Sequence, residues 1–294
     1  MENFDKIIGS GGFGLIVKHK DEDVVAKMLY GGGCDASEIE FRKHERIYQA
    51  FQKVKTYLPP HTLYNQICIS KPLGFDRDSV VKFGQSFDCF YLMTLLKNLD
   101  QELARSAGLY HVIDDGYKAY VDKVVGRRFS EPISTQNPSR GFFASYSYIA
   151  EHILPNLSPE EKGGMTTIKD IIECMGFAVG IIIFLAGYIP ADVEYTLGLS
   201  DSELCLAVLD FGMVTEITFN PDAVLEGQKE KKLNLIAQTL VSTLEVDIYL
   251  PQDDALKSIF LEGMKDAVDT SIAINPQNAL EKRYVFERFK TSFA

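Results

Sequence analysis

The chain lacks an excess of positive charge. Its 294 residues include 30 Lys and Arg against 41 Asp and Glu, which gives a net charge of -11. A surface that binds nucleic acid must neutralise phosphates with Lys and Arg, so this balance argues against a nucleic-acid-binding protein. A site for a small nucleotide stays open, because one local nest of hydrogen-bond donors is enough for a single triphosphate.

The sequence also lacks the marks of several other classes. Its five cysteines form no CxxC pair, so we expect reduced thiols and no zinc site. No basic region precedes an apolar run near the first residue, so no signal peptide is expected. The apolar run Met175–Ile189 is shorter than the roughly 20 residues that a bilayer needs. We therefore expect a buried core helix there, no membrane span, and a soluble cytoplasmic or otherwise intracellular protein.

The order of the predicted elements indicates an α+β protein. In the first hundred residues, one helix is expected at Ala36–Phe51. Strands are expected at Phe4–Lys18, with a tight turn inside it, and at Asp23–Leu29, Ile67–Phe75 and Phe87–Leu96. Helices are expected from Ile168 onwards and at Lys229–Leu244, Asp254–Val268 and Asn278–Lys290. We expect an N-terminal part at 1–97 and a C-terminal part at 98–294, with an irregular insert at about 105–166.

Two features of the N-terminal part favour a phosphate site. The stretch IGSGGFGLIVK has glycines at 9, 11, 12 and 14, which allow backbone amides to approach phosphate oxygens closely, although a plain β-turn has the same composition. Lys27 lies inside an apolar strand, where an ammonium needs a carboxylate or a ligand unless it reaches the edge. The next helix offers Glu38, Glu40 and Glu45. Any of the three could pair with Lys27; EFRKHERIYQAF resembles the acid-then-aromatic pattern of atypical kinase-like families, and this resemblance favours Glu40, while the sequence leaves Glu45 open.

Four motifs in a fixed order resemble those of the protein-kinase-like superfamily. GSGGFGLIV resembles its glycine-rich loop, VVAK its lysine strand, CFYLMTLL its hinge and LDFG its magnesium-binding motif. The resemblance covers about Phe4–Leu96 and Ile168–Met213, and IPADVEYTLG with VDIYLPQDD is similar to a kinase-like family known mainly from fungi. It implies a bilobal fold, with a small antiparallel-sheet N-lobe that carries one helix and a mostly helical C-lobe.

The resemblance also implies roles for single residues. Asp192 precedes Asp210 by eighteen positions, a spacing similar to the family's, so Asp192 stands at the place of the catalytic base and Asp210 at that of the Mg2+ ligand. Lys27, positioned by Glu40, would contact the phosphates of ATP. The residues expected to bind ATP are Gly9, Ser10, Gly11, Gly12, Phe13, Gly14, Ile16, Lys27, Met93, Thr94 and Leu96.

Two positions depart from the family's pattern. Leu197 stands where a metal-binding Asn is expected, and Glu194 stands where a basic residue is usual. Glu194 either replaces the Asn as a second metal ligand or points to solvent. Three functions follow. We favour a divergent ATP- and Mg2+-dependent phosphotransferase with a protein partner or substrate. The alternatives are a pseudokinase that binds nucleotide or a partner protein without turnover, and a nucleotidyl or glutamyl transferase on the same fold.

Overall fold

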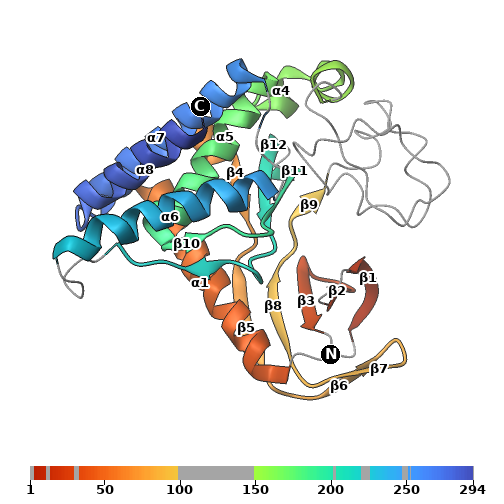
Figure 1. Cartoon of the computed structure of the whole chain (residues 1–294). Coiled ribbons are helices and arrows are strands. Elements are labelled where there is room, and N and C mark those ends of the chain that lie inside the picture. The colour runs from red at the N-terminus through yellow and green to blue at the C-terminus, as the bar shows by residue number, and fades with distance from the viewer. Residues whose placement is uncertain are drawn as a thin grey trace.

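The chain forms a mixed α+β structure, with an antiparallel sheet near the N-terminus and long helices later in the sequence (Figure 1). This confirms the α+β class expected from the sequence. The computed structural model describes residues 3–10, 14–29, 33–98, 149–200, 203–219, 226–246, 251 and 253–293. The part of the expected insert from 105 to 148 lies outside these residues.

Five strands form the first sheet in the order β1-β2-β3-β8-β5, and every neighbouring pair is antiparallel. Their bounds are Phe4–Ser10 (β1), Gly14–His19 (β2), Val24–Leu29 (β3), Phe90–Thr94 (β8) and Pro72–Asp76 (β5). Val17, Ala26 and Met28 are fully buried on one face, where they form a small core. This face is apolar because apolar side chains recur at every second position along the strands.

A hairpin lies between β5 and β8 in the sequence. It pairs β6 (Val80–Lys82) with β7 (Gln85–Phe87). Phe83 and Gly84 both have positive φ, 52° and 77°, which closes a two-residue turn of the kind that suits the twist of paired strands. Two valines and a phenylalanine supply strand-forming side chains in this otherwise polar segment.

Helix α1 (Gly33–Tyr57) is longer than predicted and packs on both the first sheet and the helical part. Phe41, near its start, packs on Phe75 and Tyr91 of the first sheet, with ring centroids 6.1 and 5.8 Å away. Ile47 and Phe51, further along, are buried in the large core of the helical part. Figure 1 shows α1 extending from β5 and β8 towards α7.

A second sheet joins the two halves of the chain. Its order is β4-β12-β11-β9, with β4 at Ile67–Ile69, β12 at Glu203–Leu209, β11 at Glu194–Ser200 and β9 at Lys97–Asn98. The predicted single strand at Ile67–Phe75 is therefore two strands in different sheets, since β4 pairs with β12 whereas β5 pairs with β8. Two short strands, β10 (Tyr188–Ile189) and β13 (Thr215–Glu216), form a separate antiparallel pair. In the sequence, β10 precedes β11 and β13 follows β12.

The other regular elements of the described residues are helices. Their bounds are Leu63–Gln66 (η1), Ile149–Ile153 (η3), Leu154–Asn156 (η4), Pro159–Lys162 (α4), Ile168–Ile181 (α5), Ile182–Ala186 (η5), Glu226–Val246 (α6), Asp254–Ile274 (α7) and Ala279–Phe293 (α8). Helices α5 and η5 contain Met175–Ala186 of the apolar run and are mostly buried, as predicted, whereas the last two residues of the run, Tyr188 and Ile189, form β10 instead of helix. Among the described residues, no helix is long and apolar enough to cross a membrane.

Candidate functional site

Lys27 lies at the centre of the first sheet and faces two carboxylates. It is in β3, between Ile16 of β2 and Tyr91 of β8, and its side chain is buried. Its Nζ lies 2.5 Å from Glu40 Oε1 and 3.0 Å from Asp210 Oδ1. The structure thus brings Lys27 and Asp210 together across 183 residues of sequence.

Of the two carboxylates that the sequence left open, Glu40 is the partner of Lys27. Glu45 instead forms an ion pair with Arg42, at 3.2 Å on the exposed side of α1. Glu40 is buried and also accepts a hydrogen bond of 2.8 Å from the hydroxyl of Tyr91. Glu40 is therefore on the side of α1 that faces the sheet and Glu45 is not, because residues five apart on a helix point in different directions.

The charges in this cluster stabilise one another. Burial lowers the pKa of Lys27, but the nearby charges of Asp210 and Glu40 outweigh it, so that its pKa stands above the usual value. Burial, together with the charge of Glu40, raises the pKa of Tyr91 well above its usual value. Lys27 therefore stays charged at neutral pH, and the Tyr91 hydroxyl stays a donor.

Asp192 and Asp210 lie in two loops that are joined to each other at both ends. Residues 190–193 and 210–214 are closed on one side by the pair Ile189↔Thr215 and on the other by Glu194↔Leu209. Because strand pairs join the loops at both ends, the two loops lie next to each other. Asp192 and Asp210 have φ of 55° and 58°, a region that few residues other than glycine adopt and that is enriched at functional sites. Asp192 is exposed, and the side chain of Asp210 is 32% exposed.

Helix α1 makes further contacts in this region through Lys43 and Arg46, two residues that were not singled out from the sequence. Lys43 Nζ donates a hydrogen bond of 3.0 Å to the carbonyl oxygen of Gly212. Arg46 pairs with Glu216 at 2.5 Å, and its guanidinium lies 5.0 Å from the centre of the Tyr188 ring. The spacing of 40, 43 and 46 along the helix was the available signal, because residues three apart share a face.

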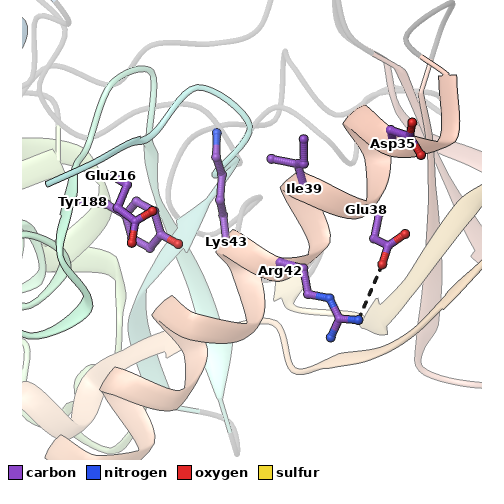
Figure 2. A pocket seen from close by; sticks show the side chains of 7 residues that line it. All are labelled: Asp35, Glu38, Ile39, Arg42, Lys43, Tyr188 and Glu216. Atoms are coloured by element: carbon purple, nitrogen blue, oxygen red, sulfur yellow. Dashed lines mark ion pairs between the residues drawn. The ribbon is translucent and has the colours of Figure 1, made fainter.

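A pocket of about 390 Å³ opens between α1 and the β10–β13 pair (Figure 2). It is lined by Asp35, Glu38, Ile39, Arg42, Lys43, Tyr188 and Glu216. Three acidic side chains and two basic ones are on its walls, and the Glu38–Arg42 ion pair lies on one side. The pocket lies on the side of α1 that carries Lys43.

No protein-family model matches the chain, and no curated protein matches it.

The residues expected to bind ATP are placed in part. Gly9 and Ser10 end β1 and Gly14 begins β2, whereas Gly11, Gly12 and Phe13 lie outside the described residues. A Cβ at Gly14 would clash with the carbonyl oxygen of Met28, so this glycine is needed for close packing of β2 on β3.

The expected hinge residues are at the end of β8 and just after it. Met93 and Thr94 are the last residues of β8, and Leu96 follows before β9. The backbone N–H of Thr94 donates to the carbonyl of Lys71 at 3.0 Å, and the Thr94 hydroxyl accepts from the Lys71 amide at 2.8 Å. The amide of Thr94 is therefore used within the protein, as is that of Leu95, which donates to the carbonyl of Asp23 at 2.9 Å.

The loop that carries Asp192 is short. Strand β11 begins at Glu194, so that Leu197, at the expected position of a metal-binding Asn, is buried in a strand opposite Leu206. Glu194 is half-buried and pairs in register with Leu209. Within the described residues, no group of three or more His, Cys, Asp or Glu side chains could hold a metal ion. The carboxylates of Asp210 and Glu194 alone would hold Mg2+ only if phosphate oxygens and waters supplied the remaining ligands.

Proposed function

We propose that the chain is a divergent ATP-dependent phosphotransferase of the protein-kinase-like type. The observation that carries the proposal is the Lys27 ammonium, held at 2.5 Å from Glu40 and at 3.0 Å from Asp210. A lysine in this position offers a fixed positive charge to phosphate oxygens, and an aspartate beside it offers a ligand for Mg2+. Lys27 comes from β3, Glu40 from the helix that follows it, and Asp210 from a loop 183 residues further along the sequence than Lys27.

The arrangement of elements supports a bilobal kinase-like organisation. The antiparallel sheet of five strands, with one long helix after its third strand, would be the small lobe that the resemblance implies. The helices from α5 to α8 would form the large lobe. The glycine-rich stretch connects β1 and β2, next to the strand that carries Lys27, which is where a loop that covers phosphates would lie.

The proposed reaction is an in-line transfer of the γ-phosphoryl group of ATP to a hydroxyl. The oxygen of the acceptor forms a bond to the γ-phosphorus, the bond from that phosphorus to the β,γ-bridging oxygen breaks, and ADP leaves with the electron pair. Asp192 would take the proton of the attacking hydroxyl. Lys27 would bind phosphate oxygens of ATP, and Asp210 would hold Mg2+, which when bound neutralises charge on the β- and γ-phosphates.

A second candidate function is nucleotide binding without turnover. Burial of Leu197 in β11 favours it, because the strand occupies the sequence position where an active kinase-like loop carries a second metal ligand. In that case the Lys27 cluster would bind nucleotide and hold the shape of a surface for a partner protein. Transfer of a different group, such as a nucleotidyl group, would use the same triphosphate site.

The first experiment measures the melting temperature with millimolar ATP, with and without Mg2+. A ligand present at about 100 times its Kd stabilises the native state by about 2.7 kcal/mol, and the Mg2+-dependent part of that shift tests the role of Asp210. Absence of any shift would remove both candidate functions. Binding without release or transfer of labelled γ-phosphate by the wild type would favour the second candidate.

The second experiment tests the proposed base with Asp192→Asn. Asn tolerates the positive φ of this position and cannot accept the proton, so we expect transfer of γ-phosphate to slow by about 100-fold or more while ATP affinity is kept. Asp21→Asn, in the exposed turn after β2, is the matched control. Equal rates for wild type and Asp192→Asn would show that another group takes the proton.

A further inference from the structure

Three charged residues of α1 each contact a different part of the site. Glu40 pairs with Lys27, Lys43 with the backbone of loop 210–214, and Arg46 with the β10–β13 pair. Neighbouring members of this series are three residues apart, so that Lys43 lies between Glu40 and Arg46 around the helix. The helix thus fixes the distance between Lys27 and the segment that follows Asp210.

The Lys43 contact acts on the loop that carries Asp210. Gly212, whose carbonyl accepts the hydrogen bond, is two residues after Asp210. A Cβ placed on Gly212 would lie 3.3 Å from Glu40 Oε2 and 3.5 Å from Asp210 Oδ1, so the backbone of the loop passes close to both carboxylates. A displacement of Gly212 would therefore also displace the carboxylate that faces Lys27.

The surroundings of Lys43 explain why its ammonium contacts a carbonyl although acidic residues line the same pocket. Glu38 is paired with Arg42 and Arg77, and Glu216 is paired with Arg46. Figure 2 shows Lys43 between these two groups, with its side chain directed away from the Glu38–Arg42 pair. A hydrogen bond from a charged donor is stronger than one between neutral groups, so this contact holds the loop more firmly than a neutral side chain would.

We propose that Lys43 is a positioning residue, which holds Asp210 against Lys27 through the carbonyl of Gly212. Asp210 has a φ of 58°, a conformation that persists only where the surroundings hold it. Loss of the Lys43 contact frees the loop to leave this conformation. The effect on Mg2+-ATP binding rests on the proposed function, whereas the effect on the loop itself does not.

The first measurement is amide hydrogen exchange of the segment 203–219, made without nucleotide. Lys43→Met keeps the helix propensity and the length of the side chain but removes the charge. We expect exchange at Phe211–Val214 to be about tenfold faster in this variant. Lys43→Arg, which keeps a charged donor, should restore slow exchange. Lys53→Met, at an exposed position of the same helix, is the matched control and should behave as the wild type.

Two results of this measurement would overturn the proposal. Unchanged exchange at Phe211–Val214 in Lys43→Met would show that the contact does not hold the loop. Faster exchange spread equally over α5 and α7 would show that Lys43 stabilises the fold as a whole and does not position Asp210.

The second measurement is the Kd of Mg2+-ATP for the same variants. We expect a rise of about tenfold in Lys43→Met and less than twofold in Lys53→Met. A wild type that does not bind ATP would refute the proposed function, and the exchange result would still decide on Lys43. Faster exchange combined with unchanged ATP affinity would limit Lys43 to holding the loop and would overturn its part in placing the metal ligand.

Discussion

Acid should destabilise the protein through one buried histidine, His44. Its side chain lies on the inner face of α1, 3% exposed, with its ring 5.1 Å from that of Phe211 and 6.1 Å from that of Tyr91. Nε2 lies 2.7 Å from the carbonyl oxygen of Ser70 and must donate to it, and Nδ1 has no hydrogen-bond partner among the described residues. Burial lowers the pKa of His44 to about 4, the Ser70 hydrogen bond opposes this, and the charge of Lys27 adds to it.

The sign and size of the effect follow from this pKa. Because the pKa of His44 is about 4 in the folded protein and 6.5 in the unfolded chain, the unfolded chain binds one more proton between these values. Stability is therefore complete above pH 6.5 and is lost as the pH falls towards 4. The difference of about 2.5 pH units corresponds to about 3.4 kcal/mol, at about 1.4 kcal/mol for each unit.

Urea unfolding between pH 7.5 and pH 4 measures this contribution when wild type and His44→Gln are compared. Gln keeps a donor near the carbonyl of Ser70 but does not titrate. We expect the advantage of the wild type over the variant to shrink by about 1.4 kcal/mol per pH unit below 6.5. His61→Asn, at an exposed position with positive φ that Asn tolerates, should show the pH dependence of the wild type. Parallel profiles for wild type and His44→Gln would refute the assigned titration.

Two further variants test the packing that holds the site. Glu40→Gln removes a buried charge beside Lys27 and should lower the free energy of unfolding by about 3 kcal/mol, whereas Glu45→Gln at an exposed ion pair should change it by less than about 1 kcal/mol. Equal effects of the two in urea unfolding would contradict the pairing. Gly176→Ala in α5 places a methyl group against the carbonyl of Phe260 and should cost about 1–3 kcal/mol, although alanine favours the helix. Gly74→Ala, with open space around its Cβ position, should be tolerated, and a melting temperature of Gly176→Ala at or above that of the wild type would contradict the close approach of α5 and α7.

The elements with a clear period could be predicted from the sequence. The alternation around the first glycines predicted β1 and β2, and the long apolar run predicted the buried helix α5. The contact between Lys27 and Asp210 was expected from the order of the motifs, and the structure contains it. These features depend on local periodicity or on short motifs, which a sequence displays directly.

The features that depend on tertiary context could not be predicted. The choice between Glu40 and Glu45 depends on which side of α1 faces the sheet, and both residues lie on the same predicted helix. The nine residues from Ile67 to Phe75 are all compatible with one strand, and only the positions of β12 and β8 divide them between two sheets.

The register of the β11–β12 hairpin was also hidden from sequence analysis. The spacing of eighteen positions between Asp192 and Asp210 matched the expected pattern. The structure uses most of that length for paired strands, because the hairpin begins at Glu194 and ends at Leu209. A count of residues between two aspartates does not distinguish a long loop from a long hairpin.

Helix α1 packs on both the first sheet and the large hydrophobic core. Its 25 residues extend over about 37 Å, with Phe41 next to the first sheet and Ile47 and Phe51 in the large core. Loss of this helix would expose the large core and the face of the first sheet that carries Lys27. The small sheet and the helical part should therefore melt as one unit, and, on the proposed function, nucleotide bound beside Lys27 should also slow the opening of the C-terminal helices.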